Sequence, residues 1–176
     1  RDFFDGRIFP NDTAIVWSEV IDRERETGNK PLILTVTNAG AARWNEARLR
    51  TEFPQLMAHR DTTKYVGEHA LDIGKMPLTE GVRIRVTRNL DKDRGLVNGA
   101  LGTIVHMLSH ETGACIARRA DNVLMLIHPV TDYRGTCLPL TYGYATTVRR
   151  VQGATLPSVG LHFDRRLPDR GYAFVA

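Results

Sequence analysis

The residues best suited to chemistry lie close together: Arg149, Arg150, Gln152 and Gly153. Two guanidinium groups beside a glycine, whose backbone N–H groups a ligand can approach, suit a phosphate. The alternative is an ordinary helix end, where cations complement the helix dipole and a glycine forms the C-cap. The residue types alone leave both interpretations open.

The residues before this group predict the element that positions it. From Thr141 to Val151 there is no proline, and Tyr144, Val148 and Val151 recur at i, i+4 and i+7. This spacing is typical of one face of a helix. Residues 159–163 then predict a strand. We therefore expect a helix that ends in the candidate phosphate-binding residues and leads into a buried strand.

A second polar loop follows an apolar run earlier in the chain. Residues 31–37 predict a strand buried on both faces. Asn38 can cap the helix that follows, from Ala41 to about Phe53, and Pro54 closes it. Together they form one βα unit of an α/β sheet, with the loop at the edge where such sheets bind ligands. A plain N-cap explains the loop equally well.

The hydrophobic pattern changes after Gly81. Apolar and polar residues alternate over residues 82–87, which predicts a strand with one buried and one exposed face. Further strands are predicted at residues 103–108, 115–118 and 123–128, separated by turn residues. Short strands at such close spacing predict a small curled antiparallel sheet, SH3-like or similar.

Composition narrows the function classes. The chain has 176 residues and a net charge of +4. Residues 81–176 carry 13 Lys and Arg against 7 Asp and Glu, so the half that holds the two arginines has a net charge of +6. A polyanion partner is plausible on that ground. Two cysteines and six histidines show no disulfide framework and no metal-ligand spacing, and no segment is long enough to span a membrane.

Three segments, in order, resemble superfamily-one 5′→3′ DNA helicases of the PIF and RecD types. The resemblance covers roughly residues 31–54 and 81–176, and Arg149 and Arg150 stand at a His-Lys pair of the family pattern. The matching segments are Ile33-Leu-x-x-Thr37-Asn38 with Trp44-Asn45, then Gly81-Val-Arg-Ile-x-Val-Thr-Arg88-Asn89-Leu-Asp with Gly95-Leu-Val-Asn98-Gly99-x-x-Gly102, and finally Tyr144-Ala-x-Thr147-x-x-x-x-Gln152-Gly153-x-Thr155-Leu.

This resemblance implies an α/β fold: an incomplete RecA-like domain of the P-loop NTPase type with an inserted small antiparallel SH3-like β-barrel. Residues 1–80 would be the first part of the second RecA-like domain, 81–137 the insertion, and 138–176 the return to the RecA-like domain. The chain begins with Arg1 and not with methionine, and we expect it to be a piece of a longer protein.

The resemblance also implies a function, that of part of an ATP-dependent DNA helicase. ATP and Mg²⁺ would be the cofactors, bound mainly by a first RecA-like domain that this chain lacks, with Gln152 and Gly153 facing the ATP. Single-stranded or forked DNA would be the partner, in processes such as repair, recombination and telomere maintenance. The implied DNA-binding residues are Thr37, Asn38, Arg88, Asn89, Thr147, Arg149 and Arg150.

The resemblance implies no catalytic residue and no metal ligand in this chain. A phosphate-binding loop of the Gly-x-x-x-x-Gly-Lys-(Ser/Thr) type is missing, and so is the arginine of motif VI, so we expect no ATP hydrolysis by the chain alone. The expected location is intracellular, in the nucleus or mitochondrion of a eukaryote and otherwise in the cytoplasm. The alternatives are a non-catalytic nucleic-acid-binding remnant, a superfamily-one RNA helicase and, more distantly, a protein-interaction domain.

Overall fold

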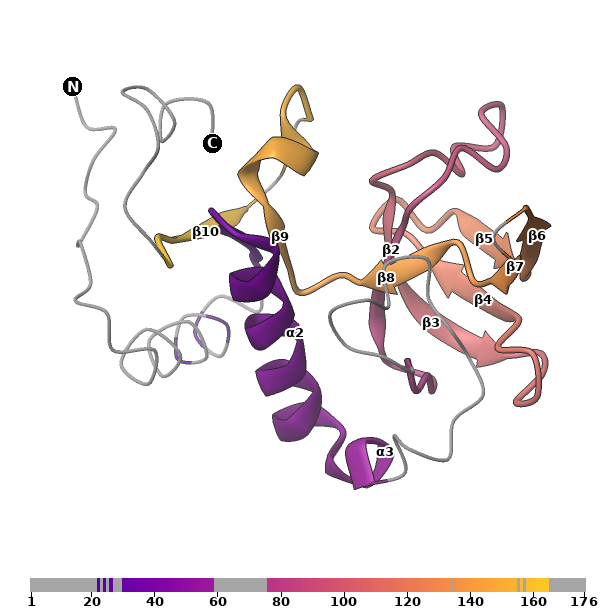
Figure 1. The fold of residues 1–176 in the computed structure, drawn as a ribbon, viewed down its shortest axis with the longest axis horizontal. Coiled ribbons are helices and arrows are strands. Elements are labelled where there is room, and N and C mark those ends of the chain that lie inside the picture. The colour runs from indigo at the N-terminus through magenta and orange to yellow at the C-terminus, as the bar shows by residue number, and fades with distance from the viewer. Residues whose placement is uncertain are drawn as a thin grey trace.

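The computed structural model describes residues 22, 24, 26, 30–58, 76–133, 135–154, 156 and 158–164. These residues form a mixed α/β structure with a parallel sheet, a larger antiparallel sheet and a short hairpin (Figure 1). Residues 14–26, for which the apolar spacing also predicts an amphipathic helix, lie mostly outside the described residues. The same holds for residues 59–75 and for the residues after Asp164.

The parallel sheet has three strands in the order β10-β1-β9, with bounds Leu32–Thr35 for β1, Ala145–Thr147 for β9 and Val159–His162 for β10. All four residues of β1 are buried, which confirms the strand predicted from the apolar run at residues 31–37. Helix α2, Asn38–Glu52, follows β1 directly and packs against β1 and β9. Its N-cap is Thr37, whose hydroxyl oxygen accepts from the N–H of Gly40, and not Asn38 as predicted.

The antiparallel sheet has five strands in the order β5-β4-β3-β2-β8. Four of them confirm the short strands predicted between residues 82 and 128, whereas β8 was not predicted as a strand. The bounds are Arg83–Val86 for β2, Leu101–Met107 for β3, Cys115–Arg118 for β4, Leu124–Ile127 for β5 and Leu140–Tyr142 for β8. An SH3-like closure of this sheet stays a prediction, as do the domain boundaries.

The core of the antiparallel sheet extends to the helices. Residues of β2, β3, β4, β5 and β8 form one buried cluster, and this cluster also includes Leu49 of α2. Phe53 and α3, Pro54–Ala58, pack against it. The hairpin of β6, Val130–Asp132, and β7, Gly135–Cys137, precedes β8. The C-terminal end of α2 therefore joins the two sheets.

The helix predicted from Thr141 to Val151 is wrong. The chain forms β8, a bend at residues 143–144, then β9, and only Val148–Val151 are helical, as the 3-10 turn η2. Backbone pairing across the molecule explains the difference, since β8 pairs with β2 and β9 pairs with β1. These non-local hydrogen bonds outweigh an i, i+4, i+7 pattern that was consistent with a helix.

Gly143 allows the chain to pass from one sheet to the other. A Cβ at this position would lie 2.7 Å from the carbonyl oxygen and 2.8 Å from the carbonyl carbon of Ile84, closer than real Cβ atoms approach backbone. The backbone N–H of Gly143 donates to the carbonyl of Arg83. The strand β9 thus begins at a position fixed by β2, which sets where η2 and its arginines lie.

Candidate nucleic-acid interface

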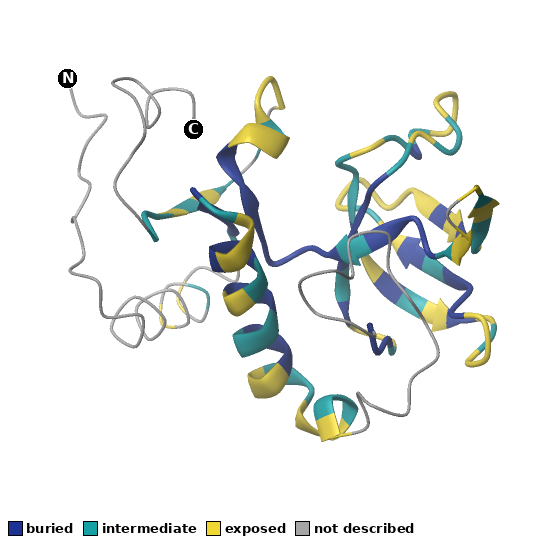
Figure 2. Cartoon of the chain, in the orientation of Figure 1, coloured by how far each residue is buried: buried dark blue, intermediate teal, exposed yellow. Residues whose placement is uncertain are grey.

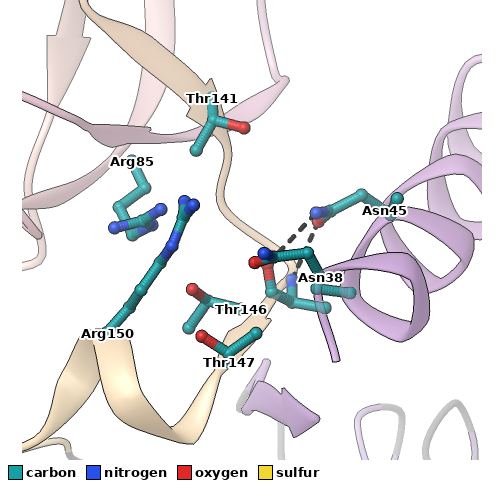
Figure 3. A pocket seen from close by; sticks show the side chains of 10 residues that line it. Asn38, Asn45, Arg85, Thr141, Thr146, Thr147 and Arg150 are labelled. Atoms are coloured by element: carbon teal, nitrogen blue, oxygen red, sulfur yellow. Dashed lines mark hydrogen bonds between the residues drawn. The ribbon is translucent and has the colours of Figure 1, made fainter. Parts of the chain in front are cut away.

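An open pocket lies between the two sheets, at the carboxyl end of β9 and the first turns of α2. It holds about 380 Å³ of empty space that includes its solvent-filled mouth. Figure 3 shows its polar side chains, contributed by α2, β2, β8, β9 and η2. The residues that line it are Asn38, Ala41, Ala42, Asn45, Arg85, Thr141, Ala145, Thr146, Thr147 and Arg150. Two of these are arginines and none is acidic, so the pocket is positively charged.

Arg85 is the most unusual residue of this pocket. Only 4% of the residue is exposed, and its Nε is buried without a hydrogen-bond partner among the residues that the structure describes. Burial and, to a smaller extent, the positive charge of Arg150 together lower the pKa of Arg85 to about 10. In Figure 3 the side chain of Arg150 reaches from η2 toward Arg85 and Thr141. Two like charges therefore share one side of the pocket.

The predicted exposed face of β2 is wrong for Arg85 and Thr87, which are both buried. Arg83 is half-buried, and its guanidinium donates to the carbonyl of Lys30 at 2.8 Å. The alternating pattern is nevertheless correct for Val82, Ile84 and Val86. Alternation reports which residues share a face, but it does not report what covers the second face.

Asn45 fixes the geometry of the pocket. Its Oδ1 accepts from the backbone N–H of Tyr144 at 3.1 Å and of Ala145 at 2.8 Å, and its Nδ2 donates to the carbonyl of Ala145 at 3.1 Å. The residue is buried. Because α2 carries Asn45, these hydrogen bonds hold the start of β9 against the helix, and the pocket lies between the two.

The tip formed by residues 149–153 is open. Arg149, Arg150, Gln152 and Gly153 are exposed. Among the described residues neither arginine forms an ion pair. In Figure 2 the turn that follows β9 is largely coloured as exposed. Gly153 has φ +82°, a conformation that L side chains rarely adopt, and a Cβ built on it would meet nothing within 4 Å. The predicted glycine turn is confirmed, and ligands can reach the tip.

Thr37 is positioned by Asp164, which follows β10. One carboxylate oxygen accepts from the backbone N–H groups of Val36 and Thr37 at 2.9 and 3.2 Å, and the other accepts from the hydroxyl of Thr37. Desolvation raises the pKa of Asp164, but these hydrogen bonds outweigh it, so the net pKa is below its ordinary value. Thr37 thus uses its side-chain and backbone donors within the chain, and its predicted DNA contact stays a prediction.

Arg88 and Asn89 do not line the pocket. Nη2 of Arg88 lies 2.7 Å from Oδ2 of Asp132, in β6, so this pair joins the end of β2 to the hairpin. Oδ1 of Asn89 accepts from the backbone N–H of Asn98 at 2.9 Å and supports the turn there. The structure therefore brings Asn38, Thr147 and Arg150 together in the pocket, with Arg149, Gln152 and Gly153 on the neighbouring tip.

The sequence did not reveal Arg85 and Thr141 as candidate site residues. Arg85 lies on β2 and Thr141 on β8 of the antiparallel sheet. Both reach the pocket because β8 pairs with β2 beside β9. No local pattern contains that information. Asn45 had one signal, since it lies in the helical segment of the family resemblance.

Other kinds of site find no support in the described part of the chain. No group of three or more His, Cys, Asp or Glu residues there could hold a metal ion. Cys115 is buried and Cys137 partly buried, both as free thiols, and burial raises the pKa of Cys115 to about 11. No helix in the described ranges has both the length and the apolar character needed to cross a bilayer.

Comparisons with known proteins find DNA helicases. Residues 70–107 match the family model described as DNA helicase Pif1, 2B domain, and this range contains β2 and β3. An ATP-dependent DNA helicase PIF1 from Xenopus laevis is 29% identical over 111 residues. This chain is similar to Pif1-type helicases over part of its length. This confirms the resemblance identified from the three sequence segments.

Solved Pif1 structures share the fold. The Pif1 helicase from Candida albicans matches 95% of this chain with a TM-score of 0.58 and 19% identity. The Pif1 helicase from Bacteroides, in complex with ADP-AlF3 and ssDNA, matches 95% with a TM-score of 0.57 and 17% identity. This chain covers 46% and 42% of those two chains, and the matched region is 17% of the Xenopus protein and 58% of this chain.

Proposed function

We propose that this chain forms part of an ATP-dependent DNA helicase, in which it contributes contacts to single-stranded DNA and one side of the ATP cleft. The observation that carries the proposal is the positively charged pocket at the carboxyl end of β9, which gathers Asn38, Thr147 and Arg150. The similarity of the chain to Pif1 helicases supports the same function. One of the similar structures is a Pif1 helicase in complex with ADP-AlF3 and ssDNA.

The pocket suits the DNA backbone better than the bases. Guanidinium, hydroxyl and amide groups donate hydrogen bonds to phosphate oxygens, and such contacts position a strand without reading its sequence. In this proposal the parallel sheet and α2 belong to a RecA-like domain, and the antiparallel sheet is its SH3-like insertion. Residues 1–80, 81–137 and 138–176 remain the proposed parts, although β8 pairs within the antiparallel sheet.

The tip would face the nucleotide. Gln152 and Gly153 are exposed beside Arg149, and the space around Gly153 leaves its backbone accessible to a phosphate. The described residues offer no acidic ligand set for Mg²⁺, so in this proposal the metal is held by a first RecA-like domain. We therefore expect the chain alone to bind single-stranded DNA and to hydrolyse no ATP. An intracellular location remains part of the proposal.

Binding of matched DNA and RNA oligonucleotides tests this function. Fluorescence anisotropy with a dT oligomer should give salt-dependent binding, and changing both Arg149 and Arg150 to Ala should reduce the salt slope by roughly one to two. Arg94→Ala is the control for loss of an exposed arginine away from the pocket. The Arg94 side chain is 83% exposed and pairs with Asp91 in the loop between β2 and β3. A clear preference for RNA would favour an RNA helicase, and absent or salt-insensitive binding would contradict the proposal.

A further inference from the structure

Arg85 is a buried cation whose Nε has no hydrogen-bond partner among the described residues. An ionised group taken out of water costs free energy unless hydrogen bonds and an opposite charge replace the lost hydration. None of the described residues that line the pocket carries a carboxylate, and the nearby side chain of Arg150 adds a second positive charge (Figure 3). Such an arrangement lowers the stability of the free protein, and a bound anion would compensate for it.

The form of the pocket indicates which anion. Arg85 and Arg150 approach the pocket from different elements, β2 and η2, so two guanidinium groups can donate to the separate oxygens of one tetrahedral anion. Thr141, half-buried on β8, adds a hydroxyl on the same side. The pocket is open to solvent, so an anionic group carried by a larger molecule can reach it from the surface.

We propose that Arg85 and Arg150 together bind one phosphodiester group of a single DNA strand, so that the antiparallel sheet and η2 hold the same phosphate. This inference rests on the proposed function and deepens it, because it assigns a strand contact to a residue of the antiparallel sheet. Relative motion of the sheet and η2 would then change the affinity for that phosphate.

Arg85→Met is the variant that tests the pair. Methionine keeps an unbranched stem that can pack in the interior but removes the charge. In the absence of DNA we expect its melting temperature to equal or exceed that of the unchanged chain, because an unpaired buried charge is removed. Binding of a dT oligomer should weaken about tenfold, and the salt slope should fall by about one.

Two further variants keep this test independent of folding defects. Arg118→Leu removes an exposed arginine from β4 of the same sheet, away from the pocket, and should change the affinity less than twofold. Arg85→Lys retains a positive charge without the planar fork, and it should bind with an affinity between those of the unchanged chain and Arg85→Met.

Modified oligonucleotides identify the contacted group. In dT oligomers with one uncharged methylphosphonate linkage at successive positions, the linkage held by the pair should show the largest loss for the unchanged chain. That loss should shrink severalfold in Arg85→Met, because the partner charge is already missing. Thermal shift with ATP in place of the oligomer separates the strand from the nucleotide, and we expect any ATP stabilisation to be equal in both proteins.

Three results would overturn the inference. A folded Arg85→Met that binds the oligomer with unchanged affinity and slope would contradict it alone and leave the proposed function in place. An ATP stabilisation that depends on Arg85, with oligomer binding unaffected, would assign the pocket to the nucleotide. Failure of the unchanged chain to bind any single strand would contradict the proposed function, and this inference with it.

Discussion

Replacing Asn45 with Ala should destabilise the chain strongly, because one side chain supplies three hydrogen bonds between α2 and the start of β9. The change leaves the backbone N–H groups of Tyr144 and Ala145 and the carbonyl of Ala145 without these partners. A buried polar group left unpaired costs about 1–3 kcal/mol. Because the adjoining pocket can admit water to some of these groups, we expect a total near the low end, about 3 kcal/mol.

Urea unfolding followed by circular dichroism measures this loss, with the midpoint and the slope fitted separately. In thermal unfolding the same loss corresponds to a decrease of roughly 10 °C for a chain of this size. Arg50→Ala on the exposed face of α2 is the control. Arg50 forms an exposed i, i+4 ion pair with Glu46, so its loss should cost under about 0.5 kcal/mol. A loss below about 1 kcal/mol in Asn45→Ala would refute the reasoning.

Three other predictions concern the elements around the pocket. Gly143→Ala should lower the free energy of unfolding by about 1–3 kcal/mol, because the added Cβ meets the backbone of Ile84. Gly160→Ala should lower it less, because the added Cβ there meets the end of the Ile33 side chain. Urea titration of both variants measures the difference. Arg48→Met should lower the free energy of unfolding by about 3 kcal/mol, because the buried guanidinium lies 2.6 Å from the carboxylate of Glu24 and 2.9 Å from that of Glu52. An unchanged melting temperature in thermal unfolding would contradict this. Burial lowers the pKa of His162 below its ordinary 6.5, so the unfolded chain binds this proton at a higher pH than the folded chain, and the free energy of unfolding should fall as pH drops below about 6.5. His162→Phe should weaken that dependence in melting curves recorded from pH 7.5 to 5.5. Identical pH profiles of the two proteins would contradict this prediction.

Local patterns predicted the βα unit well. The apolar run before Thr35 is typical of a strand covered on both faces, and a polar residue before a helical stretch is typical of a helix N-terminus. The capping residue differed by one position, Thr37 in place of Asn38, and the helix begins at Asn38 and not at Ala41. The strands β2 to β5 were likewise predictable, because their apolar alternation and turn residues are properties of short segments.

The geometry of the pocket could not be predicted in the same way. The spacing of Tyr144, Val148 and Val151 is compatible with a helix, but the backbone of this segment pairs with strands of two sheets instead. The burial of Arg85 likewise depends on β8, β9 and η2, which are distant in sequence. The accessible arginine tip, in contrast, was predicted correctly for its position, although a four-residue 3-10 turn carries it and not a long helix.

The most direct test of the account is to map the single-strand contact on the protein. Amide chemical shifts of the ¹⁵N-labelled chain, recorded during titration with a dT oligomer, report which backbone groups change their surroundings. We predict the largest changes at Asn38, Arg85, Thr147 and Arg150, with smaller ones at Gly153. Changes concentrated on β5, Leu124–Ile127, with none around the pocket would contradict the account.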